Sequence, residues 1–254
     1  MAKRKLDIER IVIANDIHVP FHDKRAVGAV LSLISDIKPV EVFLDGDIMD
    51  CYTVSKYSKD PSRGLSLLRE LDETRDLLSK VRKAARDVPI TYIEGNHEIR
   101  MKAYVNGNAP ALSAIEDLKI ENLLGLSALN ITYVPARNRG AFVRCDNVVI
   151  GHFDRVLKDS GATAKVLVND HMASVVQGHT HRLGVYYKST IGGEFVGVEG
   201  GCLCEMNPEY LDTANWQQGI TILSRTVGET DWRIESVPVS NGSLFYNGVE
   251  YYGE

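Results

Sequence analysis

Side chains that could bind a metal follow short apolar runs at five places in the chain. These candidate ligands are Asp16, His18, Asp47, Asn96, His152, His179 and His181. His179 and His181 are only two residues apart, in the sequence GHTH, directly after an apolar run at residues 173–177. The chain contains seven histidines, and five of them lie in these segments when His97 is included. Such clustering predicts side chains that converge on one point.

The donor atoms of this set are imidazole nitrogen, carboxylate oxygen and amide oxygen, without a thiolate. This mixture suits Mn, Fe, Zn, Ni or Co ions and disfavours a structural thiolate-zinc site or copper(I). Seven ligands exceed what one transition ion needs, but they match two ions that share a carboxylate. Two ions roughly 3.5–4 Å apart clamp the attacking and leaving oxygens of a phosphoryl displacement. The sequence therefore predicts a dinuclear centre for phosphoryl chemistry.

Alternating strands and helices position the first of these residues. Short β-branched apolar runs predict buried strands at residues 10–16, 40–47 and 89–96. Apolar spacing predicts one helix from the N-cap Asp23 to the stop at Pro39, an amphipathic helix over residues 64–86, and a short helix over 98–105. Ligands gather beyond the carboxyl ends of strands in open α/β sheets, so the polar residues at these ends are expected to face one pocket.

The second half of the chain reads mainly as strands. Strand signals cover residues 131–135, 140–152, 173–179, 183–189, 194–200, 218–227 and 232–239, and a helix over 162–170 interrupts them. Asn247-Gly248 predicts a hairpin turn near the C-terminus. Four tyrosines fit sheet positions better than base-stacking platforms: Tyr186, Tyr187, Tyr251 and Tyr252. Because the sequence shows no repeat and no linker, residues 1–254 are predicted to form a single domain.

The composition is ordinary for a globular protein, with 44% hydrophobic and 25% charged residues. The formal net charge of −5 argues against the broad basic surface with which proteins bind duplex DNA. No apolar run approaches the roughly 18 residues of a membrane helix, and no secretory signal is recognisable at the N-terminus. We therefore expect a cytoplasmic protein without a membrane partner, with free thiols at Cys51, Cys145, Cys202 and Cys204.

Five sequence blocks occur in the order found in calcineurin-like metallophosphoesterases, and the chain resembles that family. The blocks are DxH at residues 16–18, GDxxD at 46–50, GNHE at 95–98, the isolated His152 and GHTH at 178–181. The segment after GHTH is also similar to phage- and prophage-encoded members, which points to the cytoplasm of a bacterium or a phage-infected cell. The resemblance implies the α/β class and a four-layer α/β/β/α sandwich with two mixed central sheets.

The resemblance also implies which side chains bind which divalent ion. One ion would be held by Asp16, His18, Asp47 and His181, and the other by Asp47, Asn96, His152 and His179, with Asp47 as the bridge. Mn²⁺ is the expected metal, with Fe, Zn, Ni or Co as alternatives. His97 would stay off both ions and face the substrate. No tight motif surrounds His152, and His171 is its competitor as a ligand.

A hydrolytic mechanism follows from this charge and geometry. Two divalent ions outweigh the carboxylates of Asp16 and Asp47, so the centre attracts a phosphate anion although the chain is acidic overall. The ions lower the pKa of bound water, and a bridging hydroxide is expected to attack phosphorus in line. His97 would stabilise the developing charge or protonate the leaving oxygen as a general acid.

Neighbours of the motifs could support the centre or serve only the fold. Asp50 and Glu98 are expected to orient the ligands or to form salt bridges. Three further side chains could contact phosphate, although a structural role agrees equally well with the sequence: Arg100, Arg182 and His22.

The expected reaction is hydrolysis of a phosphomonoester or phosphodiester, with a nucleotide or single-stranded nucleic acid as the substrate class. Nucleases, phosphoprotein phosphatases and small-nucleotide phosphodiesterases of the resembled family all use this metal core. The alternative is a scaffold or binding protein that keeps the fold without the chemistry. The sequence leaves the oligomeric state open.

Overall fold

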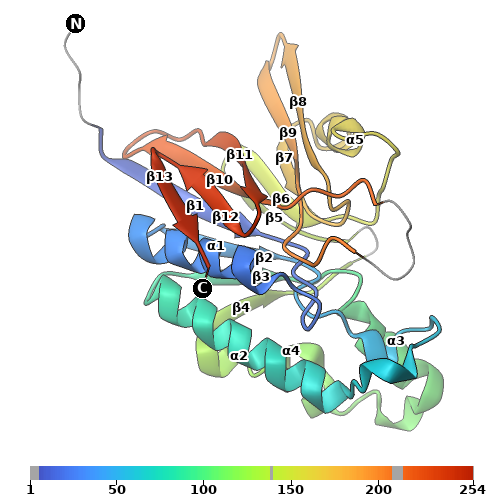
Figure 1. Cartoon of the computed structure of the whole chain (residues 1–254). Helices are drawn as coiled ribbons and strands as arrows, with labels where there is room; N and C mark the ends of the chain where they lie inside the picture. Colours follow the sequence, from blue (N-terminus) through green and yellow to red (C-terminus); the bar gives the residue numbers. More distant parts are fainter. Residues whose placement is uncertain (1–5, 138–139, 208–213, 254) are drawn as a thin grey trace, which may run out of the picture.

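Two mixed β-sheets pack face to face, and helices cover the outer face of each sheet (Figure 1). The computed structural model describes residues 6–137, 140–207 and 214–253. Within these residues the larger sheet has eight strands in the order β13-β12-β11-β10-β1-β2-β3-β4. The smaller sheet has five strands in the order β5-β6-β7-β9-β8.

Most strands and helices fall where the sequence predicts them, but the strand signal over residues 140–152 is two strands joined by a turn, and the short helix at residues 120–123 is not predicted. The larger sheet consists of β1 (Ile8–Ala14), β2 (Glu41–Asp45), β3 (Ile90–Ile93), β4 (Ile131–Val134), β10 (Gly219–Thr226), β11 (Arg233–Ser240), β12 (Ser243–Tyr246) and β13 (Val249–Tyr252). The smaller sheet consists of β5 (Ala141–Cys145), β6 (Val148–His152), β7 (Ser174–Gln177), β8 (Leu183–Thr190) and β9 (Gly193–Gly200). The α-helices are α1 (Lys24–Ile37), α2 (Leu67–Ala85), α3 (Ile99–Asn108), α4 (Ile120–Leu123) and α5 (Ala162–His171).

Alternation of side chains along the strands produces three apolar cores. Val12 of β1 packs with α1 and α2 on the outer face of the larger sheet. Its neighbour Ile13 points the other way and packs between the sheets, where it joins Ile150 of β6. Val149 of β6 in turn packs with α5 on the outer face of the smaller sheet. Three cores separate four layers, so the predicted α/β/β/α sandwich is confirmed.

Helix boundaries follow from local capping. The Asp23 carboxylate accepts hydrogen bonds from the N–H groups of Arg25 and Ala26 and starts α1, as predicted. The predicted helix over residues 64–86 begins later, at Leu67, because Ser66 is its N-cap. Gly64 instead ends a preceding 3₁₀ helix in the left-handed conformation. The helix predicted over residues 98–105 corresponds to α3, which begins at Ile99 and ends later than predicted, at Asn108.

The parallel strands bring the motif segments to one end of the molecule. β1, β2 and β3 are parallel neighbours in the larger sheet, and β6 and β7 are parallel neighbours in the smaller one. All five motif segments follow the carboxyl ends of these strands, or lie at them. The Nδ1–H of His152 in β6 donates to the carbonyl oxygen of Asp45 in β2 at 2.9 Å, which joins the two sheets at this end. A ligand site at this edge is the expected result.

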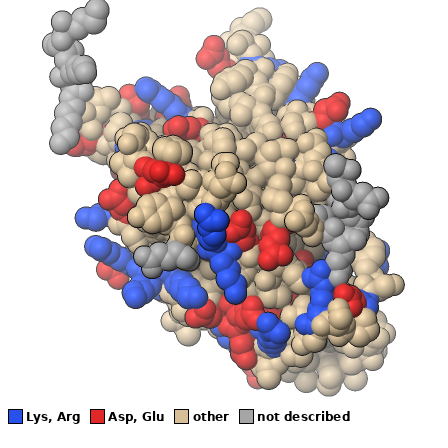
Figure 2. All heavy atoms as spheres, viewed as in Figure 1, with Lys and Arg blue, Asp and Glu red and all other residues tan. Residues whose placement is uncertain are grey.

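The C-terminal hairpin agrees with the sequence prediction. Asn247 and Gly248 both have positive φ and connect β12 to β13, and the Tyr251 hydroxyl donates to the Asp36 carboxylate of α1 at 2.6 Å. Figure 2 shows acidic and basic side chains interspersed on the visible face, without a continuous basic patch. No helix in the described residues is long and apolar enough for a bilayer span. The four predicted thiols are unpaired.

Candidate metal centre

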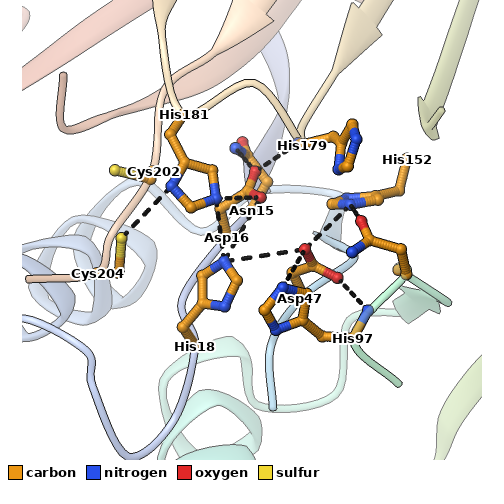
Figure 3. Close-up of polar contacts among 12 residues, drawn as sticks. Asn15, Asp16, His18, Asp47, His97, His152, His179, His181, Cys202 and Cys204 are labelled. Carbon is orange, nitrogen blue, oxygen red and sulfur yellow. Dashed lines mark hydrogen bonds and ion pairs between the residues drawn. The ribbon is translucent and has the colours of Figure 1, made fainter. Parts of the chain in front are cut away.

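The turns that carry the candidate ligands have an unusual backbone conformation. Five motif residues have φ between 50° and 71°, in the left-handed region: Asp16, His18, Asp47, His179 and His181. Residues other than glycine rarely adopt this region, and such conformations gather at functional sites. Each turn bends the chain directly after a strand, and the side chains converge in the space between the strand ends (Figure 3).

Four side chains form a first cluster. One ligand atom from each of Asp16, His18, Asp47 and His181 lies within 4.8 Å of the others. The Nε2 atoms of His18 and His181 are 3.0 Å apart, and His181 Nε2 lies 3.0 Å from Asp16 Oδ1. His18 Nε2 lies 3.8 Å from Asp47 Oδ2. All four residues are buried. This is the set that the sequence resemblance assigns to one ion.

A second cluster shares Asp47 with the first. Asp47, His152 and His179 also place their ligand atoms within 4.8 Å of one another. His152 Nε2 lies 3.3 Å from Asp47 Oδ2 and 3.1 Å from the Asn96 side-chain oxygen. Figure 3 shows Asp47 between the two groups, with His18 and His181 on one side and His152 and His179 on the other. The structure thus brings together all seven predicted ligands.

Hydrogen bonds on the far nitrogen fix which ring atom faces the centre. His152 donates through Nδ1 to the Asp45 carbonyl, so Nε2 is the ring nitrogen that faces Asp47. His18 donates through Nδ1 to Asp50 Oδ2 at 3.0 Å, which directs Nε2 toward His181. Partners of this kind orient metal-binding imidazoles in proteins. Asp50 thus lies where it can orient the His18 ring.

Glu98 supports the centre through the backbone. Its buried carboxylate accepts five hydrogen bonds of 2.6–3.1 Å, from the N–H groups of Asp47, Ile48, Met49 and Gly95 and from the Tyr92 hydroxyl. The turn after β2 and the turn after β3 are both held by this one carboxylate. The N–H of His97 adds a bond of 2.8 Å to Asp47 Oδ1. Together these contacts fix the position of Asp47.

The Asp16 carboxylate is only half satisfied by protein donors. Its Oδ2 accepts from Asn15 Nδ2 at 2.7 Å and from the His179 N–H at 2.8 Å. Its Oδ1 is buried in the first cluster, accepts no hydrogen bond of good geometry, and lies 3.0 Å from His181 Nε2. A buried carboxylate oxygen is costly without a partner. A cation at this point would satisfy it, so the donor set fits a metal ion.

Electrostatic interactions keep the cluster charged despite its burial. Burial opposes ionisation of Asp16, but His181 and His18 outweigh it and hold the pKa of Asp16 below its ordinary value. Burial likewise opposes protonation of His181, but the Asp16 carboxylate raises the pKa of His181 to about 9. Asp45 behaves differently, because burial raises its pKa to about 8 and His152 offsets this only in part. A carboxylic acid that stays neutral next to the centre avoids adding a further negative charge.

His97 and Arg100 lie together beside Asp47. His97 Nε2 is 3.8 Å from Asp47 Oδ2, and its Nδ1 is 2.9 Å from the Asp50 carbonyl oxygen. The Arg100 guanidinium donates to His97 Nε2 at 2.7 Å and to the Asp50 carbonyl at 3.0 Å. In this arrangement His97 is a neutral ring that donates to Asp50 and accepts from Arg100. A cavity of about 500 Å³ opens in front of both side chains.

Three other candidates lie apart from the centre. Arg182 donates to the Leu157 carbonyl, and neither it nor His22 belongs to the lining of the cavity beside the centre. His171 lies at the end of α5, where its ring packs against Phe142 and Phe153. Of the two competing histidines, His152 lies beside Asp47 and His171 does not. A phosphate contact by Arg182 or His22 stays a prediction.

Two supporting residues escaped the sequence analysis. Asn15 bridges Asp16 to the Gly201 carbonyl, with bonds of 2.7 and 2.6 Å. Asp45 ends β2 between the motif strands, and its carbonyl orients His152. Asn15 directly precedes the motif residue Asp16, and Asp45 lies two residues before the motif residue Asp47. That proximity was the available signal, but the contacts themselves depend on segments far away in the sequence.

Comparisons with known proteins identify the family of this chain. A family model described as calcineurin-like phosphoesterase matches residues 9–183. The Gene 54 protein of Mycobacterium phage D29 is 32% identical over 252 residues, which cover 94% of this chain and 97% of the relative. The Gene 54 protein of Mycobacterium phage L5 is 31% identical over 253 residues, with the same two coverages. A solved structure of Vacuolar Protein Sorting 29 from Cryptosporidium parvum aligns with 97% of this chain and 97% of its own, at 12% identity and a TM-score of 0.48.

The family match includes all five motif blocks, and the phage relatives align with 94% of the chain. The predicted resemblance, including the similarity to phage-encoded members, is confirmed. The chain belongs to the calcineurin-like phosphoesterase family.

Proposed function

We propose that this protein is a hydrolase that binds two divalent metal ions and cleaves phosphomonoester or phosphodiester bonds. The observation that carries the proposal is the convergence of seven oxygen and nitrogen donors from five strand ends, with Asp47 shared by both clusters. Asp16, His18, Asp47 and His181 hold one ion, and Asp47, Asn96, His152 and His179 hold the other. The donor types suit Mn, Fe, Zn, Ni or Co, and we propose Mn²⁺ from the family resemblance.

The metal ions and the protein have separate tasks. When bound, two such ions lower the pKa of water and neutralise charge on a phosphoryl group during an in-line displacement. Glu98 and Asp50 hold the ligands in place, and His97 and Arg100 face the substrate side. The His97 Nε2 atom accepts from Arg100, so His97 can deliver a proton only after Arg100 has turned toward the phosphate and Nε2 has taken up a proton from solvent. When Arg100 binds the phosphate, its hydrogen bond to His97 Nε2 breaks, and Nε2 becomes accessible.

The surroundings of the centre support a small or single-stranded substrate. A cavity of about 500 Å³ has the size of a typical small-molecule site. The mixed charges on the visible surface offer no continuous track for a duplex. We propose a nucleotide or single-stranded nucleic acid as the substrate class and, from the phage relatives, the cytoplasm of an infected bacterial cell as the place of action.

Hydrolysis of bis-p-nitrophenyl phosphate with added Mn²⁺ tests the proposal. Asp47→Asn removes a charge from both clusters, and we expect kcat/KM to fall more than about 100-fold, since even partners that only orient metal ligands contribute about 10- to 100-fold. Asp76→Asn is the matched control, because Asp76 is exposed on α2 and forms an ion pair with Lys80 away from the centre. Its activity should equal that of the unmodified protein.

Metal analysis of the same samples separates the proposal from the scaffold alternative. Two equivalents of metal together with turnover support the hydrolase. Two equivalents of metal without turnover of any phosphoester would favour a scaffold or binding protein with this fold.

A further inference from the structure

The cavity beside the first cluster has an unusually aromatic wall. Four of its fifteen lining residues are Phe21, Tyr52, Tyr57 and Trp216, whereas aromatic residues form 7% of the chain. The same cavity is lined by His18, His97 and His181, so it opens directly onto the proposed metal centre. His152 and His179 do not line it. The cavity therefore adjoins one end of the centre, next to His97 and Arg100.

The aromatic wall is held in place by the fold. The Phe21 and Tyr52 rings meet edge to face at a centroid distance of 5.5 Å, and the Arg63 guanidinium lies 4.4 Å over the Phe21 ring. The Tyr52 hydroxyl accepts from the Asp60 N–H at 2.6 Å. The backbone N–H of Tyr52 donates to the buried Glu70 carboxylate at 2.7 Å. The phenol oxygen is already engaged in the wall, and the ring lines the cavity.

Trp216 brings the aromatic surface to the metal cluster itself. Its ring centroid lies 4.3 Å from that of His181, with an angle of 57° between the planes. Trp216 is half-buried and comes from the segment between β9 and β10, whereas Phe21 and Tyr52 follow β1 and β2. Three separate segments thus bring aromatic rings to one cavity. A group that leaves phosphorus on the side of His97 would enter this space.

We propose that the cavity binds a nucleobase, so that the leaving group of the substrate is a nucleoside. The assignment rests on the proposed phosphoesterase function and specifies its substrate. Planar bases stack on aromatic rings and on guanidinium groups, and stacking tolerates different bases. Ser55, Ser58 and Asn207 also line the cavity and offer hydrogen bonds to base edges. An alkyl leaving group would use neither the ring faces nor these polar groups.

Tryptophan fluorescence tests the base contact without catalysis. The chain has two tryptophans, and Trp232 is buried in the core between the sheets. In a Trp232→Phe variant, Trp216 alone reports on the cavity. Titration with adenosine 5′-monophosphate should quench its emission to saturation, whereas ribose 5-phosphate, which lacks only the base, should not. Equal responses to both compounds, or none to either, would overturn the assignment.

Steady-state kinetics with the same two compounds test specificity. We expect kcat/KM for adenosine 5′-monophosphate to exceed that for ribose 5-phosphate by about tenfold or more, the range that base stacking supports. Trp216→Leu should remove most of this preference through KM, and Trp216→Phe should restore part of it. Tyr187→Ala is the control, because Tyr187 is exposed on β8 and lies outside the cavity lining; its preference should be unchanged. An unchanged preference in Trp216→Leu would contradict the role of Trp216.

The experiments distinguish failure of the phosphoesterase proposal from failure of the nucleobase proposal. Absence of turnover with both compounds and with bis-p-nitrophenyl phosphate would remove the phosphoesterase proposal. Base-dependent quenching in that case would still support a nucleobase site, and turnover without base-dependent quenching or preference would refute the nucleobase site alone.

Discussion

A single carboxylate, Glu98, determines where the shared ligand Asp47 lies. Its five hydrogen bonds connect the turn after β2 to the turn after β3, and it is 1% exposed. Hydrogen bonds to a buried charged group are stronger than those between neutral groups. Glu98 thus links stability and the geometry of the site in one side chain.

Replacing Glu98 with glutamine should damage both properties. An amide group has N–H donors at one end, so it cannot accept from Asp47 and Gly95 while also accepting from the other three partners. We expect Glu98→Gln to lower the free energy of unfolding by about 2–4 kcal/mol, given about 1.5–3 kcal/mol for a hydrogen bond to a charged group. Denaturant unfolding measures this loss. Glu250→Gln, at an exposed position of β13, serves as control, and equal stability of both variants would refute the role of Glu98.

At the residue scale, the sequence predicts the metal ligands better than it predicts the backbone conformations and neighbouring side chains that position them. The motif spacing identifies Asp47 and His152, because metal chemistry restricts the residue types. It does not show the left-handed backbone of Asp16 or His181, because φ depends on how each turn packs against a distant segment. The ring of Trp216 is equally hidden, since nothing near it in the sequence indicates that it lies beside His181.

At the scale of elements, the glycines of the motifs allow turns to approach one another. A Cβ atom on Gly95 would lie 2.2 Å from Asp47 Oδ1 and 2.3 Å from the Asp47 nitrogen. A Cβ atom on Gly46 would lie 2.3 Å from His152 Nδ1. Side chains at either position would therefore push the strand-end turns apart.

Substitution of two glycines should have opposite results. Gly95→Ala forces the β3 turn away from Asp47, and we expect loss of phosphoesterase activity and a lower Tm. Gly107→Ala is the matched control, because Gly107 lies within α3 with no atom near its would-be Cβ. Alanine favours a helix interior by about 0.8–1.0 kcal/mol over glycine, so this variant should be at least as stable as the parent. Thermal unfolding and the bis-p-nitrophenyl phosphate assay check both results, and an active, fully stable Gly95→Ala protein would contradict the steric argument.

The elements themselves were largely predictable. Periodicity identifies α1 and α2 and the motif strands, because each buries a continuous apolar face. The stretch over residues 106–126 gives a less regular signal, and after the end of α3 the structure has 3₁₀ turns and the short α4 there. Short helices of this kind are stabilised by contacts rather than by their own sequence pattern.

At the scale of the whole molecule, the candidate centre joins the two sheets. Asp16, His18 and Asp47 follow strands of the larger sheet, whereas His179 and His181 follow β7 of the smaller one. Sequence reasoning supplied the four-layer fold through the family resemblance. It could not supply the pairing of β10 with β1, because those strands are about two hundred residues apart and only tertiary packing selects the partner.

Metal binding should therefore stabilise the entire fold. Ions that bind only the folded state add about 2.7 kcal/mol at a concentration of 100 Kd. For a chain of this length, we expect Mn²⁺ to raise the Tm of the metal-free protein by roughly 5–10 °C. Calorimetry with and without a chelator measures the shift. It should persist in Asp76→Asn and shrink in Asp47→Asn, and no shift in the parent protein would refute ligation across the sheets.

Ligands drawn from both sheets also impose an order on biogenesis. The ribosome synthesises Asp16 and Asp47 well before His179 and His181. A nascent chain therefore contains these carboxylates before the histidines that follow β7 exist. Under the proposed assignment, the complete coordination sphere forms only after the second sheet docks. Binding of both ions is thus a late step, and a chain whose synthesis stops before residue 178 lacks two of the proposed metal ligands.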